Sequence, residues 1–345
     1  MGIRLLKAFT WGANFSGQLG DGTNTNSNVP VPVRGLTNLI AIAAGGAHSL
    51  ALLSDGTVQA WGDNQFGQLG DGTNTSSNVP VPVSGLTNLI AIAAGHFHSL
   101  ALLSDGTVQA WGANGAGQLG DGTNTDSNVP VPVSGSTNVI AIAAGGAHSL
   151  ALLSDGTVQA WGDNTFGQLG DGTNTSSNVP VPVSGLTNVI AIAAGANHSL
   201  AFLSDGTVQA WGDNTFGQLG DGTNTRRNVP VPVSGLTNVI TIAAGGNHSL
   251  ALLSDGTIQA WGDNTGSNVP VPVSGLTNVI AIATGDFHSL ALLSDGTVQV
   301  WGDNTFGQLG DGTNTSSNVP VPVSGLTNGI AIAAGMLHSL AIVMI

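Results

Sequence analysis

A single tryptophan recurs through the whole chain at a nearly constant interval. Neighbouring copies are 50 residues apart, except for one step of 40 residues between Trp261 and Trp301. A period of this length is typical of propeller blades or solenoid units, which bury their hydrophobic faces only against one another. The sequence therefore predicts a series of similar units, one for each of Trp11, Trp61, Trp111, Trp161, Trp211, Trp261 and Trp301.

Each full repeat contains four runs with the pattern of β-strands. In the copy from residue 88 to residue 135 these runs span residues 90–95, 98–103, 107–112 and 129–133. The second run is apolar on both faces, as expected for a sheet packed between two neighbours. Asp105-Gly106 separates the second and third runs, which indicates a β-hairpin with a type I′ turn, in which both central residues have positive φ.

The fourth run contains all the prolines of the chain. Its sequence is Val-Pro-Val-Pro-Val, and the seven copies account for all 14 prolines. Pro130 and Pro132 are two residues apart, so both missing N–H groups fall on one edge of the strand. This run is predicted to be the outermost strand, with Val129, Val131 and Val133 bonded inward and the prolines blocking edge-to-edge aggregation.

The two ends of the chain carry complementary parts of a repeat. The chain begins with a third strand, residues 5–12, and ends with a second strand, residues 338–345. We expect Met1 to Gly12 to pair with His338 to Ile345, because closure removes open sheet edges. The predicted fold is all-β: a closed seven-bladed β-propeller with four antiparallel strands per blade, one blade completed by both termini, and a single domain over residues 1–345.

The composition excludes several classes of partner and site. The chain has no cysteine, and its 5 basic residues face 19 acidic ones, for a net charge of -14. A duplex-binding protein should present a basic face, so we expect no nucleic acid, and Arg226-Arg227 is interpreted as a solvated surface pair. There is no signal-peptide pattern and no apolar run long enough to span a membrane. We expect a cytoplasmic monomer that binds no membrane.

Three motifs of the repeat resemble the repeat of the regulator of chromosome condensation family. They are A-x-G-x-x-H-S-L-A-L, D-G-x-V-x-A-W-G-x-N and G-Q-L-G-D-G-T, and they cover nearly the whole chain. The resemblance implies a seven-bladed propeller. It also implies that a propeller face holds the partner, as in the related β-lactamase inhibitors and exchange factors. The fold serves many tasks, so the resemblance does not identify the partner.

The repeated polar residues are interpreted as structural. A His-Ser-Asp triad would have to recur around a ring, so the histidines are predicted to be buried and hydrogen-bonded to backbone. The repeat has no second histidine or cysteine for a metal, and the loop at residues 67–75 is interpreted as a turn rather than a calcium or phosphate site. Each tryptophan is predicted to pack between blades. We expect no catalytic residue, metal or cofactor. The repeated histidines are His48, His98, His148, His198, His248, His288 and His338.

The residues that differ between repeats are the candidates for function. The pair between the first and second strands varies most, and in a ring these pairs should gather on one face around the axis. The predicted partner-binding residues are His96, Phe97, Asn197, Asn247, Asp286, Phe287, Met336 and Leu337. Hot spots favour Trp, Tyr and Arg, which this set lacks, so we expect modest affinity.

The sixth repeat runs from Thr265 to Gly266 without the ten residues equivalent to residues 216–225. A tolerated loop deletion is favoured over a notch that admits a partner. The leading hypothesis for function is a non-catalytic binding scaffold whose face engages a protein or glycan. The alternatives are a guanine-nucleotide exchange factor for a small GTPase, or a recently amplified repeat protein with little evolved function.

Overall fold

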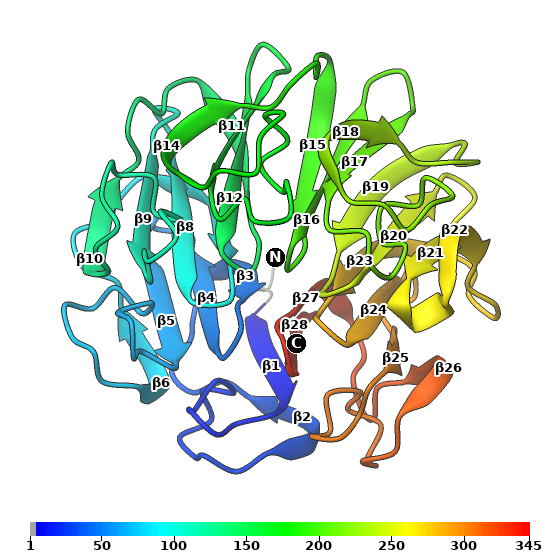
Figure 1. The fold of residues 1–345 in the computed structure, drawn as a ribbon. Helices are drawn as coiled ribbons and strands as arrows, with labels where there is room; N and C mark the ends of the chain where they lie inside the picture. The colour runs from blue at the N-terminus through cyan, green and yellow to red at the C-terminus, as the bar shows by residue number, and fades with distance from the viewer. Residues whose placement is uncertain (1–4) are drawn as a thin grey trace.

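Seven four-stranded antiparallel sheets form a closed ring in the computed structural model, which describes residues 5–345 (Figure 1). We number the blades by their tryptophans, so that blade 1 holds Trp11 and blade 7 holds Trp301. Within each blade the first strand lies nearest the axis and the fourth lies outermost. The all-β, seven-bladed prediction is confirmed.

The strands recur at equivalent positions in every blade. Blade 2 is β3 (Leu39–Ala44), β4 (His48–Leu53), β5 (Val58–Gly62) and β6 (Ser77–Pro82); blade 3 is β7 (Leu89–Ala94), β8 (His98–Leu103), β9 (Val108–Gly112) and β10 (Ser127–Pro132); blade 4 is β11 (Val139–Ala144), β12 (His148–Leu153), β13 (Val158–Gly162) and β14 (Ser177–Pro182). Blade 5 is β15 (Val189–Ala194), β16 (His198–Leu203), β17 (Val208–Gly212) and β18 (Arg227–Pro232); blade 6 is β19 (Val239–Ala244), β20 (His248–Leu253), β21 (Ile258–Gly262) and β22 (Ser267–Pro272); blade 7 is β23 (Val279–Thr284), β24 (His288–Leu293), β25 (Val298–Gly302) and β26 (Ser317–Pro322).

Blade 1 is built from both ends of the chain. Its strands are β27 (Gly329–Ala334), β28 (His338–Met344), β1 (Leu6–Gly12) and β2 (Ser27–Pro32), in the order β2-β1-β28-β27. Strand β1 pairs with β28 from Leu6 opposite Met344 to Gly12 opposite His338. Terminal closure is thus confirmed. The part of that prediction that concerned residues 1–4 lies outside the described residues.

The outermost strand has the inward backbone pairing predicted from its prolines, with one exception. In β10, Val131 pairs with Ala110, and the Val133 N–H donates to the Val108 carbonyl at 3.0 Å. The register shifts before that point, and Val129 bonds to Ser127 instead: its N–H donates to Ser127 Oγ at 3.4 Å, and Oγ donates back to its carbonyl at 2.7 Å. The inward bonding predicted for Val129 is therefore wrong, because a local serine satisfies its backbone.

The hairpin between the second and third strands forms, but its turn type differs from the prediction. Gly106 has φ of +81°, whereas Asp105 is not among the described residues with positive φ. Gly106 N–H donates to the Leu103 carbonyl, and Leu103 N–H donates to the Thr107 carbonyl. This is the three-residue hairpin loop, a type I turn followed by a glycine. Asp105 Oδ1 accepts from the Thr107 N–H and hydroxyl at 3.0 and 2.7 Å, which fixes the loop.

The hydrophobic core lies between neighbouring blades. Each cluster joins the second and third strands of one blade to the tryptophan of the next; Leu50, Val58 and Ala60 of blade 2, for example, pack with Trp111 of blade 3. A leucine from the long loop after the third strand, such as Leu69, is fully buried in the same cluster. The predicted role of the tryptophans as packing residues between blades is confirmed.

A polar chain crosses the same junctions. His48 Nε2 lies 2.9 Å from Ser99 Oγ of the next blade, and this hydroxyl donates to the Gln68 carbonyl at 2.9 Å. The Nε1–H of Trp111 donates to the same carbonyl at 2.9 Å. Since the serine proton is used toward the glutamine, the imidazole must donate through Nε2. The histidines are buried as predicted, but the predicted bond to backbone is wrong: Nε2 bonds to serine, and Nδ1 has no partner among the described residues.

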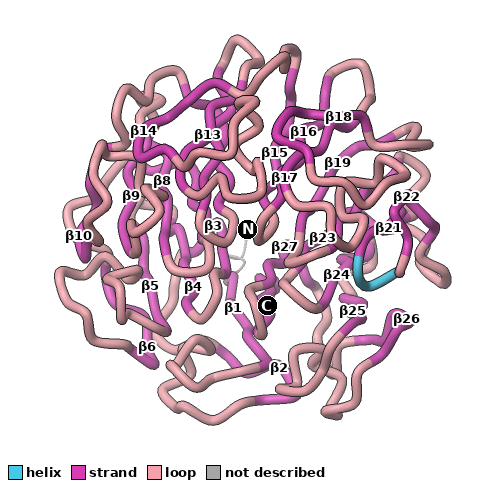
Figure 2. Tube along the Cα trace, in the orientation of Figure 1, coloured by secondary structure: helices cyan, strands magenta, loops and turns pink. Residues whose placement is uncertain are grey.

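One short helical turn interrupts the pattern. It is η1 (Asp263–Thr265), which replaces the long loop in blade 6 (Figure 2). Gly266, with φ of +62°, ends this turn and leads directly into β22. Within residues 5–345 the structure contains no helix with the length and hydropathy of a membrane span.

Candidate functional site

The loops at one end of the axis form what we call the axial face. It consists of the short loops between first and second strands (residues 45–47 and their equivalents) and the long loops between third and fourth strands (residues 63–76 and their equivalents). Backbone hydrogen bonds hold the two sets together; the Asp63 N–H, for example, donates to the Ala47 carbonyl at 2.8 Å. The axial face is therefore a rigid surface rather than a set of independent loops.

The first member of each variable pair lies beside the central channel. The channel is a narrow cavity of about 60 Å³ lined by the ends of all seven first strands, which are Ala-Gly in six blades and Thr284-Gly285 in blade 7. His96, Asp286 and Met336 are the large side chains at its mouth. A cavity of this size has room for a few waters and excludes a drug-sized ligand. Any partner of this region must bind on the face rather than inside the channel.

One hydrogen-bonded contact between an imidazole and a carboxylate crosses the channel mouth. His96 Nε2 of blade 3 lies 3.1 Å from Asp286 Oδ1 of blade 7, and both side chains are partly buried. These blades lie three positions apart around the ring, so the contact joins opposite sides of the axis (Figure 1). The two residues are consequently less available to a partner than the sequence alone suggested.

The second members of the pairs form an outer ring. Phe97 and Phe287 are 40% and 44% exposed, whereas Asn197, Asn247 and Leu337 are only partly exposed. Phe97 also packs edge-on against Phe66 of blade 2, with ring centroids 5.5 Å apart. The structure thus brings all eight predicted residues to one face, in two rings rather than one. Their role in binding stays a prediction.

Sequence reasoning missed a larger set of aromatic residues on the same face. Five long loops carry a phenylalanine near Gly-Gln-Leu-Gly, directly before it in four of them and one residue earlier at Phe15. Phe15 and Phe216 are 61% and 44% exposed. Phe15 of blade 1 packs edge-on against Phe306 of blade 7, with centroids 5.2 Å apart. With Phe97 and Phe287, seven of the nine phenylalanines lie on the axial face. The available signal was that this loop position differs between repeats, with alanine at position 116 where other repeats have phenylalanine. The loop phenylalanines are Phe15, Phe66, Phe166, Phe216 and Phe306.

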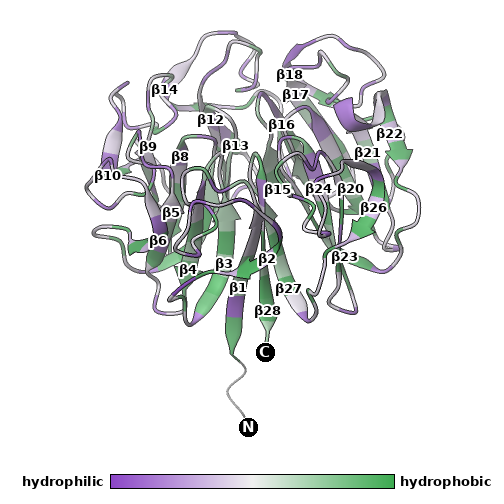
Figure 3. Cartoon of the chain, turned by 90° about the horizontal axis from the view of Figure 1, so that it is seen from below, coloured by the Kyte–Doolittle hydropathy of each residue, from purple (hydrophilic) through white to green (hydrophobic). Residues whose placement is uncertain are grey.

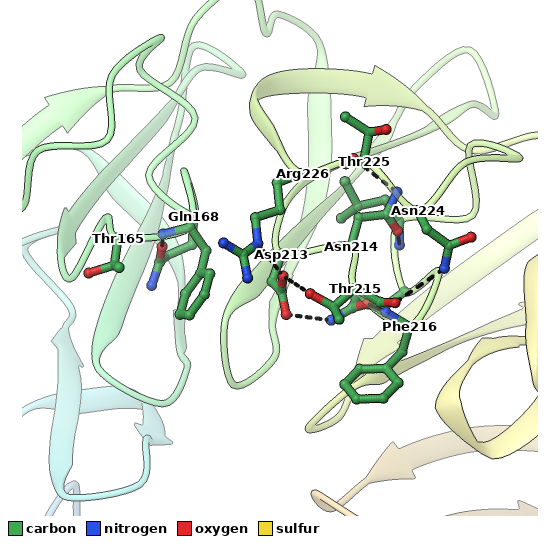
Figure 4. Close-up of polar contacts among 12 residues, drawn as sticks. Thr165, Gln168, Asp213, Asn214, Thr215, Phe216, Asn224, Thr225 and Arg226 are labelled. Carbon is green, nitrogen blue, oxygen red and sulfur yellow. Dashed lines mark hydrogen bonds and ion pairs between the residues drawn. The ribbon is translucent and has the colours of Figure 1, made fainter.

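The two arginines of blade 5 are engaged with neighbours rather than simply solvated. Arg226 Nε donates to Asp213 Oδ1 at 2.9 Å, and Figure 4 shows this side chain directed at Asp213 while Phe216 points away. The guanidinium also lies 4.5 Å from the ring centroid of Phe166 in blade 4. Arg227 pairs with Asp221 at 3.1 Å. The interpretation as a solvated pair was incomplete, because aspartates within the loop neutralise both charges.

The aspartates after Trp-Gly form hydrogen bonds that hold the long loops in place. Asp63 Oδ2 accepts from Gln68 Nε2 at 2.7 Å, while the Gln68 side-chain oxygen accepts from the Phe66 N–H at 2.9 Å. In the adjoining turn, Asn64 Nδ2 donates to Asp71 Oδ1 and to the Thr73 and Thr75 carbonyls. The polar groups of this loop are thus used in holding its own conformation, which is the turn role expected from the sequence.

The opposite end of the axis carries a second apolar feature. The second residue of each first strand is an isoleucine with 43% to 56% of its surface exposed. These residues lie at the strand ends nearest the start of β1 and the end of β28, where Figure 3 is coloured hydrophobic. We call them the isoleucine ring: Ile40, Ile90, Ile140, Ile190, Ile240, Ile280 and Ile330.

The geometry of the repeated histidines and serines is unsuited to nucleophilic catalysis. In six of the seven blades the serine hydroxyl accepts from an imidazole and donates to a carbonyl, so no base is placed to remove its proton. Burial lowers the pKa of His98 to about 3 and that of His148 to about 4, because the protonated ring would be desolvated. Within residues 5–345 no three histidine or aspartate side chains are grouped as metal ligands.

The seven blades, the narrow channel and the rigid axial face define a β-propeller that offers an external surface rather than an internal pocket. The chain belongs to the family of RCC1-like domains, whose model matches residues 6–269 and 135–344. Comparison with curated protein sequences finds no match.

Solved structures of RCC1-type proteins share the whole fold. Human WBSCR16 is 26% identical, with a TM-score of 0.89 and 98% of each chain covered. Prp20p of Saccharomyces cerevisiae, studied for its binding properties to Gsp1p and histones, is 27% identical, with a TM-score of 0.88, 100% of this chain and 93% of that chain covered. Yeast RCC1 (Prp20) bound to Kap60 is 26% identical, with a TM-score of 0.89 and coverage of 100% and 90%.

Proposed function

We propose that the protein is a non-catalytic binding scaffold whose axial face engages a protein partner. The observation that carries the proposal is the placement of seven of the nine phenylalanines on this one face. Aromatic side chains are enriched at protein interfaces, and exposed apolar groups on a rigid surface mark interaction sites. The loops that bear them are fixed by backbone bonds, so little entropy is lost on binding.

Charge indicates the chemistry of the partner. The chain has a net charge of -14, and Asp126, Asp163 and Asp303 lie in the long loops of the axial face. A partner that presents basic side chains around apolar ones would complement this surface. The similar yeast protein was studied for its binding to histones and Gsp1p, and a basic protein is the class we infer here.

The affinity should be modest. The face has no tyrosine, and all seven tryptophans are buried between blades or nearly so. Hot spots concentrate in Trp, Tyr and Arg, and the exposed Arg226 of this face is already paired with Asp213, so binding must be spread over several phenylalanines. Such an interface should weaken in steps as they are removed, rather than collapse with one substitution.

The experiment is affinity capture from the source organism with two matched variants. One carries Phe97→Ala, Phe287→Ala, Met336→Ala and Leu337→Ala on the axial face; the other carries Ile90→Ala, Ile140→Ala, Ile240→Ala and Ile280→Ala in the isoleucine ring. Both must melt as folded proteins. A partner lost only by the first supports the proposal. Loss only by the second would transfer the function to the opposite end, and no specific partner would favour a repeat protein with little evolved function.

An exchange factor for a small GTPase is the second candidate. It is favoured by the likeness to Prp20p over the full length of this chain. Against it, the long loops of six blades are equal in length, and that of blade 6 is shorter, so no loop is extended to displace a nucleotide. Release of a fluorescent guanine nucleotide from purified GTPases of the source organism tests this candidate. Acceleration that depends on Phe97 and Phe287 would establish it.

A further inference from the structure

Six of the seven junctions between blades are filled by a long loop. At the junction of blades 5 and 6, the Gln218 carbonyl accepts from Trp261 Nε1 at 2.8 Å and from Ser249 Oγ at 2.9 Å. Leu219 follows and is fully buried against that tryptophan. The junction of blades 6 and 7 lacks these loop residues, because η1 takes their place.

At this junction, the groups that would bond to a long loop are left without that loop's carbonyl acceptors. Trp301 Nε1 has no acceptor among the described residues, and Ser289 Oγ lies 2.9 Å from His248 Nε2 but has no carbonyl acceptor among them. In the other six blades the equivalent residue, a serine in five of them and Arg34 in blade 1, donates its N–H to a loop glycine carbonyl, as Ser234 does to Gly220 at 2.9 Å. For the Ser274 N–H the structure gives no such acceptor. At the filled junctions, carbonyls of the long loop accept from the equivalents of these three groups.

A cavity of about 270 Å³ occupies this position. Trp301, Val273, Ser274 and Asn318 contribute to its lining, which contains no carboxylate, ammonium or guanidinium group. Trp301 is 6% exposed, whereas its six equivalents are fully buried. The space is small for a drug-sized ligand. Its mixed apolar and polar lining suits an apolar side chain whose flanking backbone is hydrogen-bonded.

We propose that this open junction, formed by blades 6 and 7, binds in trans an extended peptide segment of a partner protein that presents a leucine flanked by backbone carbonyls. The six filled junctions define the occupant, since Gly-Gln-Leu-Gly supplies both elements there. The carbonyl before the leucine accepts from Trp301 and Ser289, the leucine packs on the tryptophan, and the following glycine carbonyl accepts from Ser274. This site is separate from the axial aromatic residues and does not depend on their function.

The first test uses the synthetic peptide Gly-Gln-Leu-Gly-Asp-Gly-Thr-Asn-Thr, with binding followed by calorimetry and by tryptophan emission. We expect saturable binding at one site and a blue shift in emission as the Trp301 edge leaves water. The same peptide with alanine in place of leucine should bind at least tenfold more weakly, because the buried side chain supplies most of the affinity.

Matched variants locate the site. Trp301→Phe keeps an aromatic side chain but removes the indole Nε1 donor, and it should weaken binding about fivefold. Trp261→Phe, at a filled junction, should leave the affinity unchanged. Inserting a copy of residues 216–225 between Thr265 and Gly266 should abolish binding. Undetectable binding to the native chain, or equal binding by the insertion variant, would overturn the proposal.

Discussion

At the scale of single residues, six of the seven junctions depend on one carbonyl that serves two donors. The Gln118 carbonyl accepts from Ser149 Oγ at 3.0 Å and from Trp161 Nε1 at 2.9 Å, and the serine in turn binds His98 of the neighbouring blade at 2.9 Å. The sequence predicted that the histidines and tryptophans are buried, because they recur in every repeat. It could not show their partners, which come from other repeats and depend on how blades stack.

The buried histidines should make the protein sensitive to mild acid. Their pKa values are lowered to about 3 or about 4, as for His198 and His288, chiefly by desolvation. In the unfolded chain they titrate near 6.5, so between pH 6.5 and about 4 the unfolded state binds more protons. Stability should be complete above pH 7 and fall as the pH drops through this range, by about 1.4 kcal/mol per pH unit for each histidine.

Urea unfolding at a series of pH values measures this effect. The aspartates whose pKa is lowered, such as Asp55, titrate below about pH 4 in the unfolded chain and act outside the window. Unfolding at pH 5 should therefore take up about seven protons, one for each buried histidine. A urea midpoint that is constant between pH 7 and pH 5 would contradict the histidine environment described above.

At the scale of elements, local patterns predicted strands well and turns less well. Alternation, Asp-Gly and the paired prolines placed the four strands, because these signals act within a few residues. The type I′ turn at Asp105-Gly106 and the inward bonds of Val129 were wrong, since side chains of Asp105 and Ser127 satisfy the backbone instead. The phenylalanines of the axial face were missed because the long loops were treated as turns and their outward-facing residues were not compared.

Deletion of a long loop should cost much more than its exposed position suggests. Removing residues 216–225 from blade 5 would reproduce the open junction of blade 6. It would remove Leu219 from the core and leave Trp261 Nε1 and Ser249 Oγ without their acceptor. We expect a loss of about 3 kcal/mol or more.

Urea unfolding and tryptophan emission check this expectation together. The deletion variant should unfold at lower urea, and its emission should shift to the red as the edge of Trp261 meets water. Deletion of Ser76 and Ser77 cannot serve as a control, because Ser77 is the first residue of β6. The insertion variant of blade 6 is the better comparison, and its stability should change in the opposite direction. Unchanged stability in both variants would refute the role given to the loops.

At the scale of the whole molecule, the ring is held closed by pairing of the two ends. Strand β1 lies between β2 and β28, with seven residue pairs against β28 from Leu6 to Gly12. This closure was predictable, since the half-repeats at the two ends are complementary. The contact between His96 and Asp286 across the axis could not be predicted, because no local pattern relates residues 190 positions apart.

Deleting residues 1–12 should open the ring. The variant loses β1 and the packing of Trp11 against blade 7, so we expect a lower melting temperature and association between exposed edges of β2 and β28. Calorimetry and size-exclusion chromatography measure the two effects. The native chain should melt in one cooperative transition, as the prediction of a single domain requires. Equal melting of both proteins would show that closure does not stabilise the ring.

The most direct test of the binding face compares two positions in blade 3. A photoactivatable amino acid is placed at Phe97, on the axial face, or at Ile90, in the isoleucine ring at the opposite end of the same blade. Cells of the source organism that express each variant are irradiated, and crosslinked proteins are identified. We predict a discrete crosslinked protein from position 97 and none from position 90. A partner crosslinked from position 90 alone would contradict the proposal that the axial face binds the partner.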